Sequence, residues 1–475
     1  MADSIKTKTV HGVIWSALER FSLQGVQFLI NIVMARLLLP SDYGLIAMLA
    51  IFLQISQAFV DSGFTNALIQ RKDRNEVDFS TVFYFNIVIA VVFYLILFVA
   101  APWIADFYHM PALVAVTRVI ALNLIISALS AVHKTKLTIA IDFKTQAKAS
   151  FTAAVVSGVM GIWMAYTGWG VWSLVVQTLM NALFLTLLLY YFLRWRPLLV
   201  FSVSSFRRLF AFGSKLLVSG LIHTIYYNLY VLVIGRKFSA RELGFYTRAE
   251  QFAIFPSSNL NAVISRVTFP ILSSIQDDTD RLADVYRKYI RLASFIIFPL
   301  MMGLAALAKP VIVLLLTEKW VGAVVLLQIL CFDWMFDHLS VINLNLLYVK
   351  GRSDLALRLE VVKKVIATVI LFSSVPFGLV GMCWGRVLYS LIATYLNTYY
   401  TKSLIGLSLG KQVRDIAPYW LLAFAMGGVV VGASSLCDLL WLQLVAGIAV
   451  GIVFYLGRIY VLKLSVYREL RALIK

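Results

Sequence analysis

Charged residues are scarce in this sequence. They make up only 14% of the 475 residues, whereas soluble domains contain about 25%. Hydrophobic residues make up 61% of the chain. So few polar side chains cannot cover the surface of a water-soluble globule of this size. The composition therefore excludes a soluble domain and indicates a protein embedded in a membrane.

Cysteines and catalytic motifs are also scarce. The three cysteines, Cys331, Cys383 and Cys437, are isolated in apolar runs and lack metal-binding spacing. The sequence contains no Walker loop and no HExxH motif, and no GxSxG motif within a soluble frame. We therefore expect no metal, no cofactor and no enzymatic activity. The net charge of +19 is spread over short links between apolar runs, which argues against a nucleic-acid-binding face.

Long apolar runs are abundant. Runs of about 20 residues match a hydrocarbon core of about 30 Å, and in lipid the backbone must be satisfied within helices. We expect an all-α membrane protein with about fourteen transmembrane helices, and no link that holds a soluble domain. The longest internal links are expected at His133–Ala149 and Pro270–Lys288, each with room for at most one surface amphipathic helix. Most of the 42 Lys and Arg residues fall in every second link, which predicts that both termini are cytoplasmic.

One segment occurs twice. Val33–Leu45 (VMARLLLPSDYGL) returns in the second half as Val233–Phe245 (VIGRKFSARELGF), with Gly44 aligned to Gly244. Each copy reads as an apolar helix end, a charged turn and a glycine that enters a second helix. A repeat at this distance predicts two parallel six-helix lobes. We expect them at residues 1–200 and 201–401, with two additional helices in 402–475.

Polar side chains inside the apolar runs indicate function, because they are costly in lipid. In the first span, Arg20 and three amide side chains follow spacings that place them on one helix face. Later spans carry similar stripes. We expect the striped helices to surround a shared water-filled cavity. The residues in question are Arg20, Gln24, Gln27 and Asn31; Asp61; Lys215, Tyr226 and Tyr230; Arg248 and Glu250; Asp333 and Asp337; and Arg386, Tyr389 and Asn397.

These residues suggest three roles. Cations at mid-depth attract an anion, and guanidinium groups suit phosphate oxygens, so we expect a diphosphate at Arg20, Lys215, Arg248 and Arg386. We expect Gln24, Gln27, Asn31, Tyr226, Tyr230, Tyr389 and Asn397 to line the cavity around a sugar. Asp61, Glu250, Asp333 and Asp337 are candidates for coupling transport to Na⁺ or H⁺.

Structural explanations stay open for the same residues. Polar stripes often join neighbouring helices without binding a ligand. Arg20 has Glu19 and Asp61 as alternative ion-pair partners. The long side chains of Lys215, Arg248 and Arg386 are also able to snorkel to the membrane surface.

The hairpin ARLLLPSDYGL and the stretch Asp61–Asp73 (DSGFTNALIQRKD) resemble the polysaccharide transporter family, the Wzx-type flippases, and especially its colanic-acid exporter (WzxC-like) branch. The resemblance covers essentially the whole chain. It implies the MATE-like fold of the multidrug/oligosaccharidyl-lipid/polysaccharide (MOP) exporter superfamily. It also implies export of undecaprenyl-pyrophosphate-linked oligosaccharide across the bacterial inner membrane by alternating access, during lipopolysaccharide or exopolysaccharide synthesis. The implied partners are this lipid-linked substrate, membrane lipids, and the glycan polymerase or glycosyltransferase machinery.

Three rival functions stay open at this point. A MATE-type cation-coupled drug antiporter would need carboxylates for organic cations, which Asp333 and Asp337 provide. A membrane glycan ligase or polymerase would need large outer loops for acceptor sugars, and the expected outer links are short. A scaffold of the glycan-synthesis complex would tolerate the loss of every cavity charge.

Overall fold

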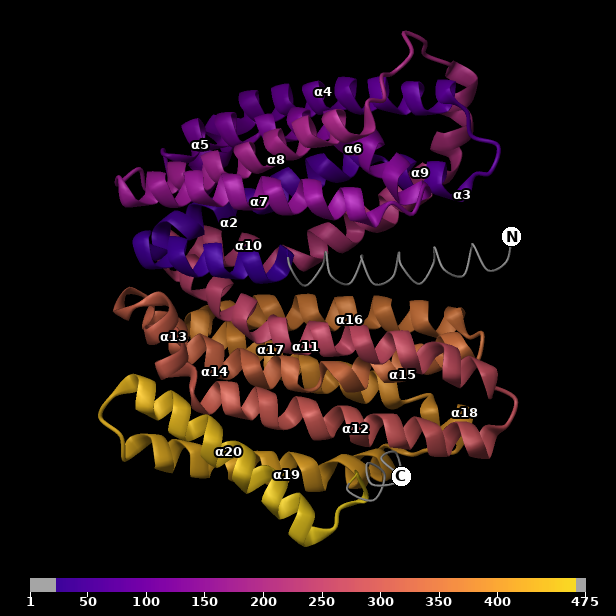
Figure 1. Cartoon of the computed structure of the whole chain (residues 1–475). Helices are drawn as coiled ribbons and strands as arrows, with labels where there is room; N and C mark the ends of the chain where they lie inside the picture. Colours follow the sequence, from indigo (N-terminus) through magenta and orange to yellow (C-terminus); the bar gives the residue numbers. More distant parts are fainter. Residues whose placement is uncertain (1–22, 467–475) are drawn as a thin grey trace. The chain divides into compact units, whose positions relative to one another are not determined.

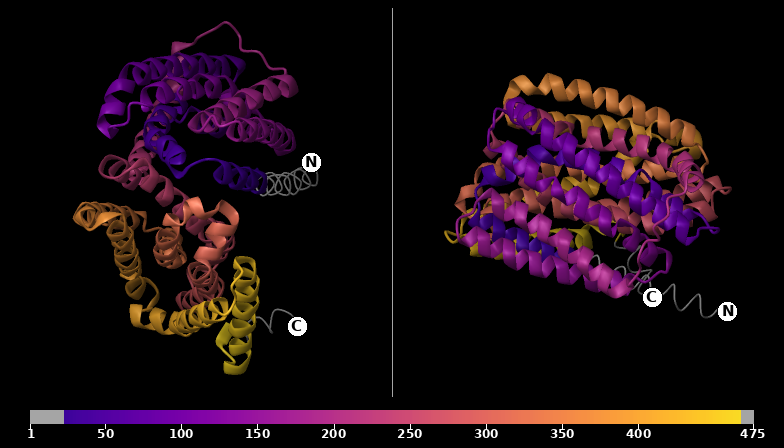
Figure 2. Two further views of the ribbon diagram at one scale, coloured as in Figure 1. Left: turned by 90° about the vertical axis from the view of Figure 1, so that its left-hand side faces the viewer. Right: turned by 90° about the horizontal axis from the view of Figure 1, so that it is seen from above.

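The computed structural model describes residues 23–466, and every regular element in that range is a helix. The chain folds as two units, Met1–Gly244 and Phe245–Lys475. Within each unit the long helices run side by side (Figure 1), as the turned views in Figure 2 also show. The predicted all-α class is confirmed.

The first unit contains, within its described part, an apolar helix at Leu23–Leu37 and nine further helices. Helix α6 packs against both α4 and α8, and α7 packs on α8. The bounds are α2 (Pro40–Asp61), α3 (Phe64–Gln70), α4 (Glu76–Tyr108), α5 (Leu113–Ile120), α6 (Leu122–Ile139), α7 (Phe143–Tyr166), α8 (Val171–Leu193), α9 (Val203–Tyr227) and α10 (Leu229–Lys237).

The second unit follows from α11, which begins before the boundary between the units and continues beyond it. Helix α12 packs on α14 and α19, while α17 packs on α14 and α16. The bounds are α11 (Ala240–Ser274), α12 (Thr279–Ala306), α13 (Ala308–Leu316), η1 (Glu318–Trp320), α14 (Gly322–Met335), α15 (Asp337–Val349), α16 (Ser353–Ser374), η2 (Val375–Phe377), α17 (Gly378–Thr398), α18 (Thr401–Ile405), α19 (Leu409–Ser435) and α20 (Leu440–Leu462).

Eleven segments of the described chain are long and apolar enough to cross a membrane. One of them, Ser353–Ile405, contains both α16 and α17. Helix α11 is not among the eleven, and charged residues such as Arg248 and Glu250 lower its hydropathy. The protein is therefore a multi-pass membrane protein. The total of fourteen spans and the division at residues 200 and 401 stay predictions.

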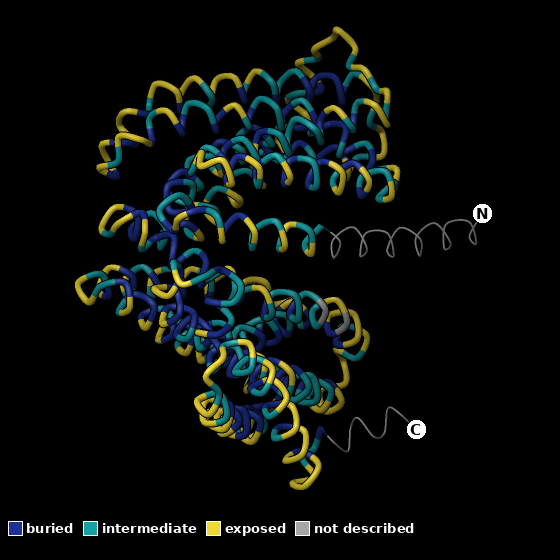
Figure 3. Tube along the Cα trace, turned by 60° about the vertical axis from the view of Figure 1, so that its left-hand side comes forward, coloured by how far each residue is buried: buried dark blue, intermediate teal, exposed yellow. Residues whose placement is uncertain are grey.

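The helices expose large apolar side chains on their outward turns, where Figure 3 shows exposed residues in yellow. On α4, Val99 and Trp103 are 60% and 69% exposed, and on α20 Val453 is 72% exposed. Water would make such surfaces costly, whereas hydrocarbon does not. The exposed apolar faces therefore agree with a lipid environment.

The repeated turns are built in the same way. In the first copy, the Asp42 carboxylate accepts a hydrogen bond from the backbone N–H of Leu39 at 2.9 Å. In the second copy, the Glu242 carboxylate accepts from the N–H of Ser239 at 2.9 Å. An acidic side chain that reaches back to the residue before the helix satisfies an otherwise unpaired N–H group. The predicted repeat is confirmed at these two turns.

The glycines of the repeat allow the two turns to touch reciprocally. A Cβ atom at Gly44 would lie 1.8 Å from the carbonyl oxygen of Ala240, and one at Gly244 would lie 1.9 Å from that of Pro40. Ala240 and Pro40 occupy equivalent repeat positions. A pair of reciprocal contacts is what a local twofold axis produces. Only glycine fits at these two crossing points.

Both of the long links are shorter than predicted, because the flanking helices continue into them. Helix α6 continues to Ile139 and α7 begins at Phe143, where the Asp142 side chain accepts from the backbone N–H of Thr145 at 3.1 Å. Likewise, α11 continues to Ser274 and α12 begins at Thr279. Apolar runs mark only the lipid-facing part of a helix, and polar residues extend it into water.

Candidate functional site

A buried ion cluster lies inside the second unit. It contains Glu250 of α11, Asp333 of α14 and Arg386 of α17. One terminal nitrogen of Arg386 donates to Glu250, and the other lies 2.7 Å from Asp333 Oδ2. The side chains of Arg386, Glu250 and Asp333 are 13%, 17% and 10% exposed, respectively. We call these three residues the ion cluster.

Aromatic rings enclose the ion cluster. The guanidinium of Arg386 lies 5.9 Å from the ring centre of Tyr246 and 5.8 Å from that of Trp334. The same guanidinium donates to the Tyr246 hydroxyl group. Cation–ring contacts of this kind are strongest where water is excluded. The rings therefore favour a charged arginine at this depth.

Local sequence explains how three helices meet at one arginine. Tyr246 and Glu250 are four residues apart on α11, so both side chains lie on one helix face. The Ser390 hydroxyl, one turn beyond Arg386, donates to the backbone carbonyl of Asp333 at 2.8 Å. This bond holds α17 against α14 beside the ion cluster.

A polar seam continues from the ion cluster along α11. Asn261 donates to Asp337 Oδ2 at 2.6 Å, and the Ser257 hydroxyl donates to the backbone carbonyl of Trp334 at 3.2 Å. Further along, Asn345 donates to the Ser265 hydroxyl at 3.5 Å. The polar seam consists of Ser257, Asn261, Ser265, Asp337 and Asn345. It carries hydrogen-bonding groups through an otherwise apolar helix interface.

The structure brings together some of the predicted site residues. Arg386, Glu250 and Asp333 meet in the ion cluster, and Asp337 joins the polar seam. Arg248 is buried at 6% exposure, donates to Gln251 and lies 5.9 Å from the Trp320 ring centre. The structure therefore rules out surface snorkelling for Arg248 and Arg386.

Other predicted residues of the second unit lie on α17. Asn397 is buried, whereas Tyr389 is partly exposed. Neither takes part in the ion cluster. Their role at a sugar stays a prediction.

The predicted residues of the first unit are more dispersed. Arg20 lies outside the described residues, and Lys215 is exposed on α9. Asp61 accepts from the Thr65 hydroxyl at 2.7 Å. The remaining members are exposed or partly exposed along the helix Leu23–Leu37 and along α9 and α10, namely Gln24, Gln27, Asn31, Tyr226 and Tyr230. Their binding roles stay predictions.

Sequence reasoning missed a cluster at the start of α4. Asp78 is fully buried and lies 2.8 Å from Arg208 Nη2, while Glu76 lies 2.6 Å from Lys136 and accepts from the Trp195 ring N–H at 2.7 Å. These contacts hold the link between α8 and α9 against α4. The available signal was the cap at Asn75, which pairs reciprocally with Asp78.

The turn between α3 and α4 carries an exposed ion pair. Arg71 Nη2 lies 2.6 Å from Asp73 Oδ2. This hydrogen bond lowers the pKa of Asp73 and raises the pKa of Arg71, so both groups stay charged at neutral pH. A solvated pair of this kind stabilises the fold little.

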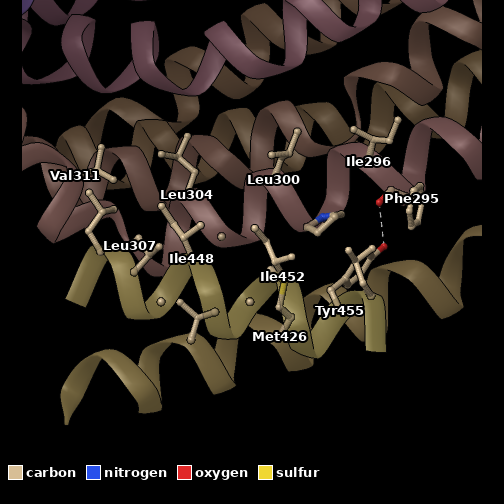
Figure 4. A pocket seen from close by; sticks show the side chains of 17 residues that line it. Phe295, Ile296, Leu300, Leu304, Leu307, Val311, Met426, Ile448, Ile452 and Tyr455 are labelled. Carbon is tan, nitrogen blue, oxygen red and sulfur yellow. Dashed lines mark hydrogen bonds between the residues drawn. The ribbon is translucent and has the colours of Figure 1, made fainter. Parts of the chain in front are cut away.

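An apolar cavity of about 520 Å³ also lies within the second unit (Figure 4). Ile296, Leu300 and Leu304 of α12 face Ile448 and Ile452 of α20 across it. At one end, the Tyr455 hydroxyl donates to the carbonyl oxygen of Phe295 at 3.1 Å. The lining offers hydrocarbon contacts and almost no polar group, which suits an alkyl or isoprenoid chain.

Residues 33–325 match the family of polysaccharide biosynthesis proteins, and this match covers more than half of the chain. The chain belongs to this family. The family assignment agrees with the resemblance carried by the ARLLLPSDYGL hairpin.

Curated relatives of this polysaccharide biosynthesis protein align over most of their length. The teichuronic acid biosynthesis protein TuaB of Bacillus subtilis (strain 168) is 26% identical, with 91% of this chain and 90% of TuaB covered. The lipopolysaccharide biosynthesis protein WzxC of Escherichia coli (strain K12) is 27% identical, with 90% and 89% covered. The succinoglycan biosynthesis transport protein ExoT of Rhizobium meliloti (strain 1021) is 25% identical, with 99% and 96% covered.

Solved structures show the same fold. The lipid II flippase MurJ in an inward closed conformation has a TM-score of 0.76 and 14% identity, with 96% of this chain and 99% of MurJ covered. An inward-facing multidrug resistance MATE family transporter of the MOP superfamily has a TM-score of 0.60 and 14% identity, with 87% and 96% covered. The predicted MATE-like fold is confirmed.

Proposed function

We propose that this protein is a flippase that moves polyprenyl-pyrophosphate-linked oligosaccharide across the bacterial inner membrane by alternating access. The observation that carries the proposal is the family match over residues 33–325. The relatives WzxC and ExoT add support, because their names connect them with lipopolysaccharide and succinoglycan synthesis. The multi-pass helical fold suits transport of a lipid-linked substrate.

The lipid tail needs an apolar path, and the second unit offers one. The cavity between α12 and α20 is lined by aliphatic side chains such as Leu300, Leu304 and Ile452. An isoprenoid chain gains about 0.8 kcal/mol for each CH₂ group that leaves water, so it stays in lipid or in apolar protein. We assign the cavity to part of the substrate tail.

We assign the diphosphate to Arg20 and Lys215. Lys215 is exposed on α9, so its ammonium group is available to an anion. Arg248 and Arg386 are less suited to this role because both are buried and hydrogen-bonded within the second unit. Gln24, Gln27, Asn31, Tyr226 and Tyr230 would contact the sugar from the neighbouring turns.

Orientation and partners complete the proposal. The distribution of Lys and Arg favours cytoplasmic N- and C-termini. The substrate is handed over between glycosyltransferases and a polymerase, which are the partners that we propose. The flippase itself makes and breaks no covalent bond, so it is a transporter and not an enzyme.

A MATE-type drug antiporter is the second candidate. Its support is the similarity of this fold to that of a MATE family transporter. An organic cation would need accessible carboxylates, but Glu250 and Asp333 are both occupied by Arg386. The arginine therefore favours the flippase.

Cells that depend on this protein for glycan export provide the test. The double variant Arg20→Ala/Lys215→Ala should stop surface glycan from appearing and should cause lipid-linked oligosaccharide to accumulate inside. Lys411→Ala removes an exposed lysine of α19 and serves as the matched control. Normal export by the double variant at normal protein levels would contradict the assignment of the diphosphate to these two residues. Efflux of ethidium without glycan export would favour the antiporter.

A further inference from the structure

The ion cluster contains one more acidic group than basic group. Glu250 and Asp333 each bring a carboxylate, and both contact the single guanidinium of Arg386. All three side chains are at least four-fifths buried. A buried carboxylate without a full counter-charge takes up a proton, because the charged form is poorly solvated there.

Among residues 23–466, no basic group other than Arg386 forms an ion pair with Glu250 or Asp333. On α11, Arg248 adds one positive charge, and at the start of α15 Asp337 adds one negative charge. On α16, Lys363 pairs with Glu360. The other titratable groups close by are Tyr246 of α11, Cys383 of α17, and His338 of α15, which contacts Ser294 of α12 at 2.8 Å. The excess carboxylate therefore remains.

We propose that the ion cluster is a proton-binding site, in which Glu250 and Asp333 share one exchangeable proton beside Arg386. The proposal rests on the proposed flippase function and supplies its coupling ion. Arg386 occupies the position between two carboxylates that a free metal cation would otherwise take. A hydronium ion transfers a proton to one carboxylate oxygen, an O–H bond forms, and a water molecule leaves; release reverses this step.

The polar seam provides a second, independent observation. Asn261 is 7% exposed, and its amide nitrogen donates a hydrogen bond to Asp337. Its Oδ1 atom receives no hydrogen bond from any of residues 23–466. A buried acceptor without a donor is costly unless a donor visits it. A seam that carries protons along α11 toward the ion cluster would provide that donor.

Proton binding gives the ion cluster two states. With the proton released, Arg386 divides its donors between two carboxylates. With the proton bound, one carboxylate becomes neutral and its ion pair with Arg386 is weakened, while the other pair persists. Because Glu250, Asp333 and Arg386 belong to α11, α14 and α17, the proton alters contacts that join three helices. Such a change is able to bias the helices between two arrangements.

Infrared difference spectroscopy of the full-length protein in lipid vesicles tests the site directly. A protonated carboxyl group has a C=O stretching band that a carboxylate lacks. We expect the wild-type protein to lose one such band as the pH rises. Loss of this titrating band in Glu250→Gln or in Asp333→Asn supports the proposal, and its retention in both variants overturns it.

Two further variants keep the test interpretable. Asp78→Asn changes a buried carboxylate that is paired one-to-one with Arg208, so it should retain the titrating band. If Asp78→Asn alone abolishes the band, the proposal fails. The triple variant Glu250→Gln/Asp333→Asn/Arg386→Gln removes all three charges of the ion cluster, so it leaves no unpaired charge there. It should lack the band, and it is used if a single variant does not fold.

Transport measured in the same vesicles separates this proposal from the proposed function. The probe is undecaprenyl pyrophosphate that carries a fluorescent sugar. We expect an imposed pH gradient to accelerate wild-type flipping at least several-fold and to leave Glu250→Gln unaffected. Equal acceleration of the variant overturns the proton site and leaves the flippase intact. The absence of flipping by the wild type would instead overturn the function and leave the infrared titration unchanged.

Discussion

Single residues decide the electrostatics of the second unit. Asp415 of α19 contacts both Arg287 and Arg291 of α12, at 2.6 Å and 3.7 Å, so two basic groups meet one acidic group. The ion cluster has the opposite ratio, since Arg386 serves both Glu250 and Asp333. Removing an acidic group and removing the basic group from the ion cluster should therefore have different effects.

The variants Asp333→Asn and Arg386→Gln test this asymmetry. Asp333→Asn leaves a balanced pair of Arg386 and Glu250, so we expect a loss of at most about 1 kcal/mol in the free energy of unfolding. Arg386→Gln leaves two buried carboxylates without their counter-charge, and we expect a loss of about 3–5 kcal/mol. Thermal unfolding in detergent at neutral pH measures both. Equal losses would show that the charges are not coupled as the distances indicate.

At the scale of the helix, glycine determines where elements approach. Gly44 and Gly244 meet the backbone of the opposite turn, whereas a Cβ atom at Gly220 of α9 would meet no atom within 4 Å. Glycine therefore has different roles at these three positions. At the first two positions it permits a crossing, and at the third it only lowers helix propensity.

We expect Gly44→Ala to destabilise the crossing by about 1–3 kcal/mol or more, because the added methyl group overlaps the carbonyl of Ala240. Gly220→Ala is the matched control. It should be neutral or stabilise α9 by up to about 1 kcal/mol through higher helix propensity. Protein yield and thermal unfolding of both variants give the comparison. A well-folded Gly44→Ala protein with unchanged stability would contradict the close contact.

Much of this architecture is predictable from sequence, because lipid imposes strong rules on composition. Apolar runs predict the helices, and the turns around Asp42 and Glu242 predict the repeat. Helix bounds were less accurate, since α6 and α11 continue into polar sequence. The ion-pair partners of individual side chains were not predictable from the sequence. The spacing of Glu250 or Asp333 places each on a helix face, but only packing decides that both face Arg386.

At the scale of the whole molecule, we assign the substrate tail to the apolar cavity of the second unit. Ile452 lines this cavity, whereas Val453, the next residue of α20, does not and is 72% exposed. Successive residues on a helix point in directions about 100° apart. These two positions therefore offer a matched pair for a bulky substitution.

We expect Ile452→Trp to slow flipping about tenfold, which corresponds to roughly 1.4 kcal/mol, because the ring fills space that the tail would occupy. Val453→Trp should leave the rate unchanged, because its ring would lie outside the cavity. Initial rates in vesicles, corrected for the amount of folded protein, measure the effect. Equal flipping rates for both variants would show that the substrate tail does not pass through the cavity.

We propose that the protein itself carries a lipid-linked sugar across a bilayer. The most direct measurement places purified protein in vesicles that contain undecaprenyl pyrophosphate with a fluorescent sugar, and follows how fast the inner-leaflet sugar becomes accessible to a membrane-impermeant quencher. We expect accessibility to grow with the amount of wild-type protein and to be lost in Arg20→Ala/Lys215→Ala. A rate equal to that of protein-free vesicles, with folded protein present, would contradict this proposal.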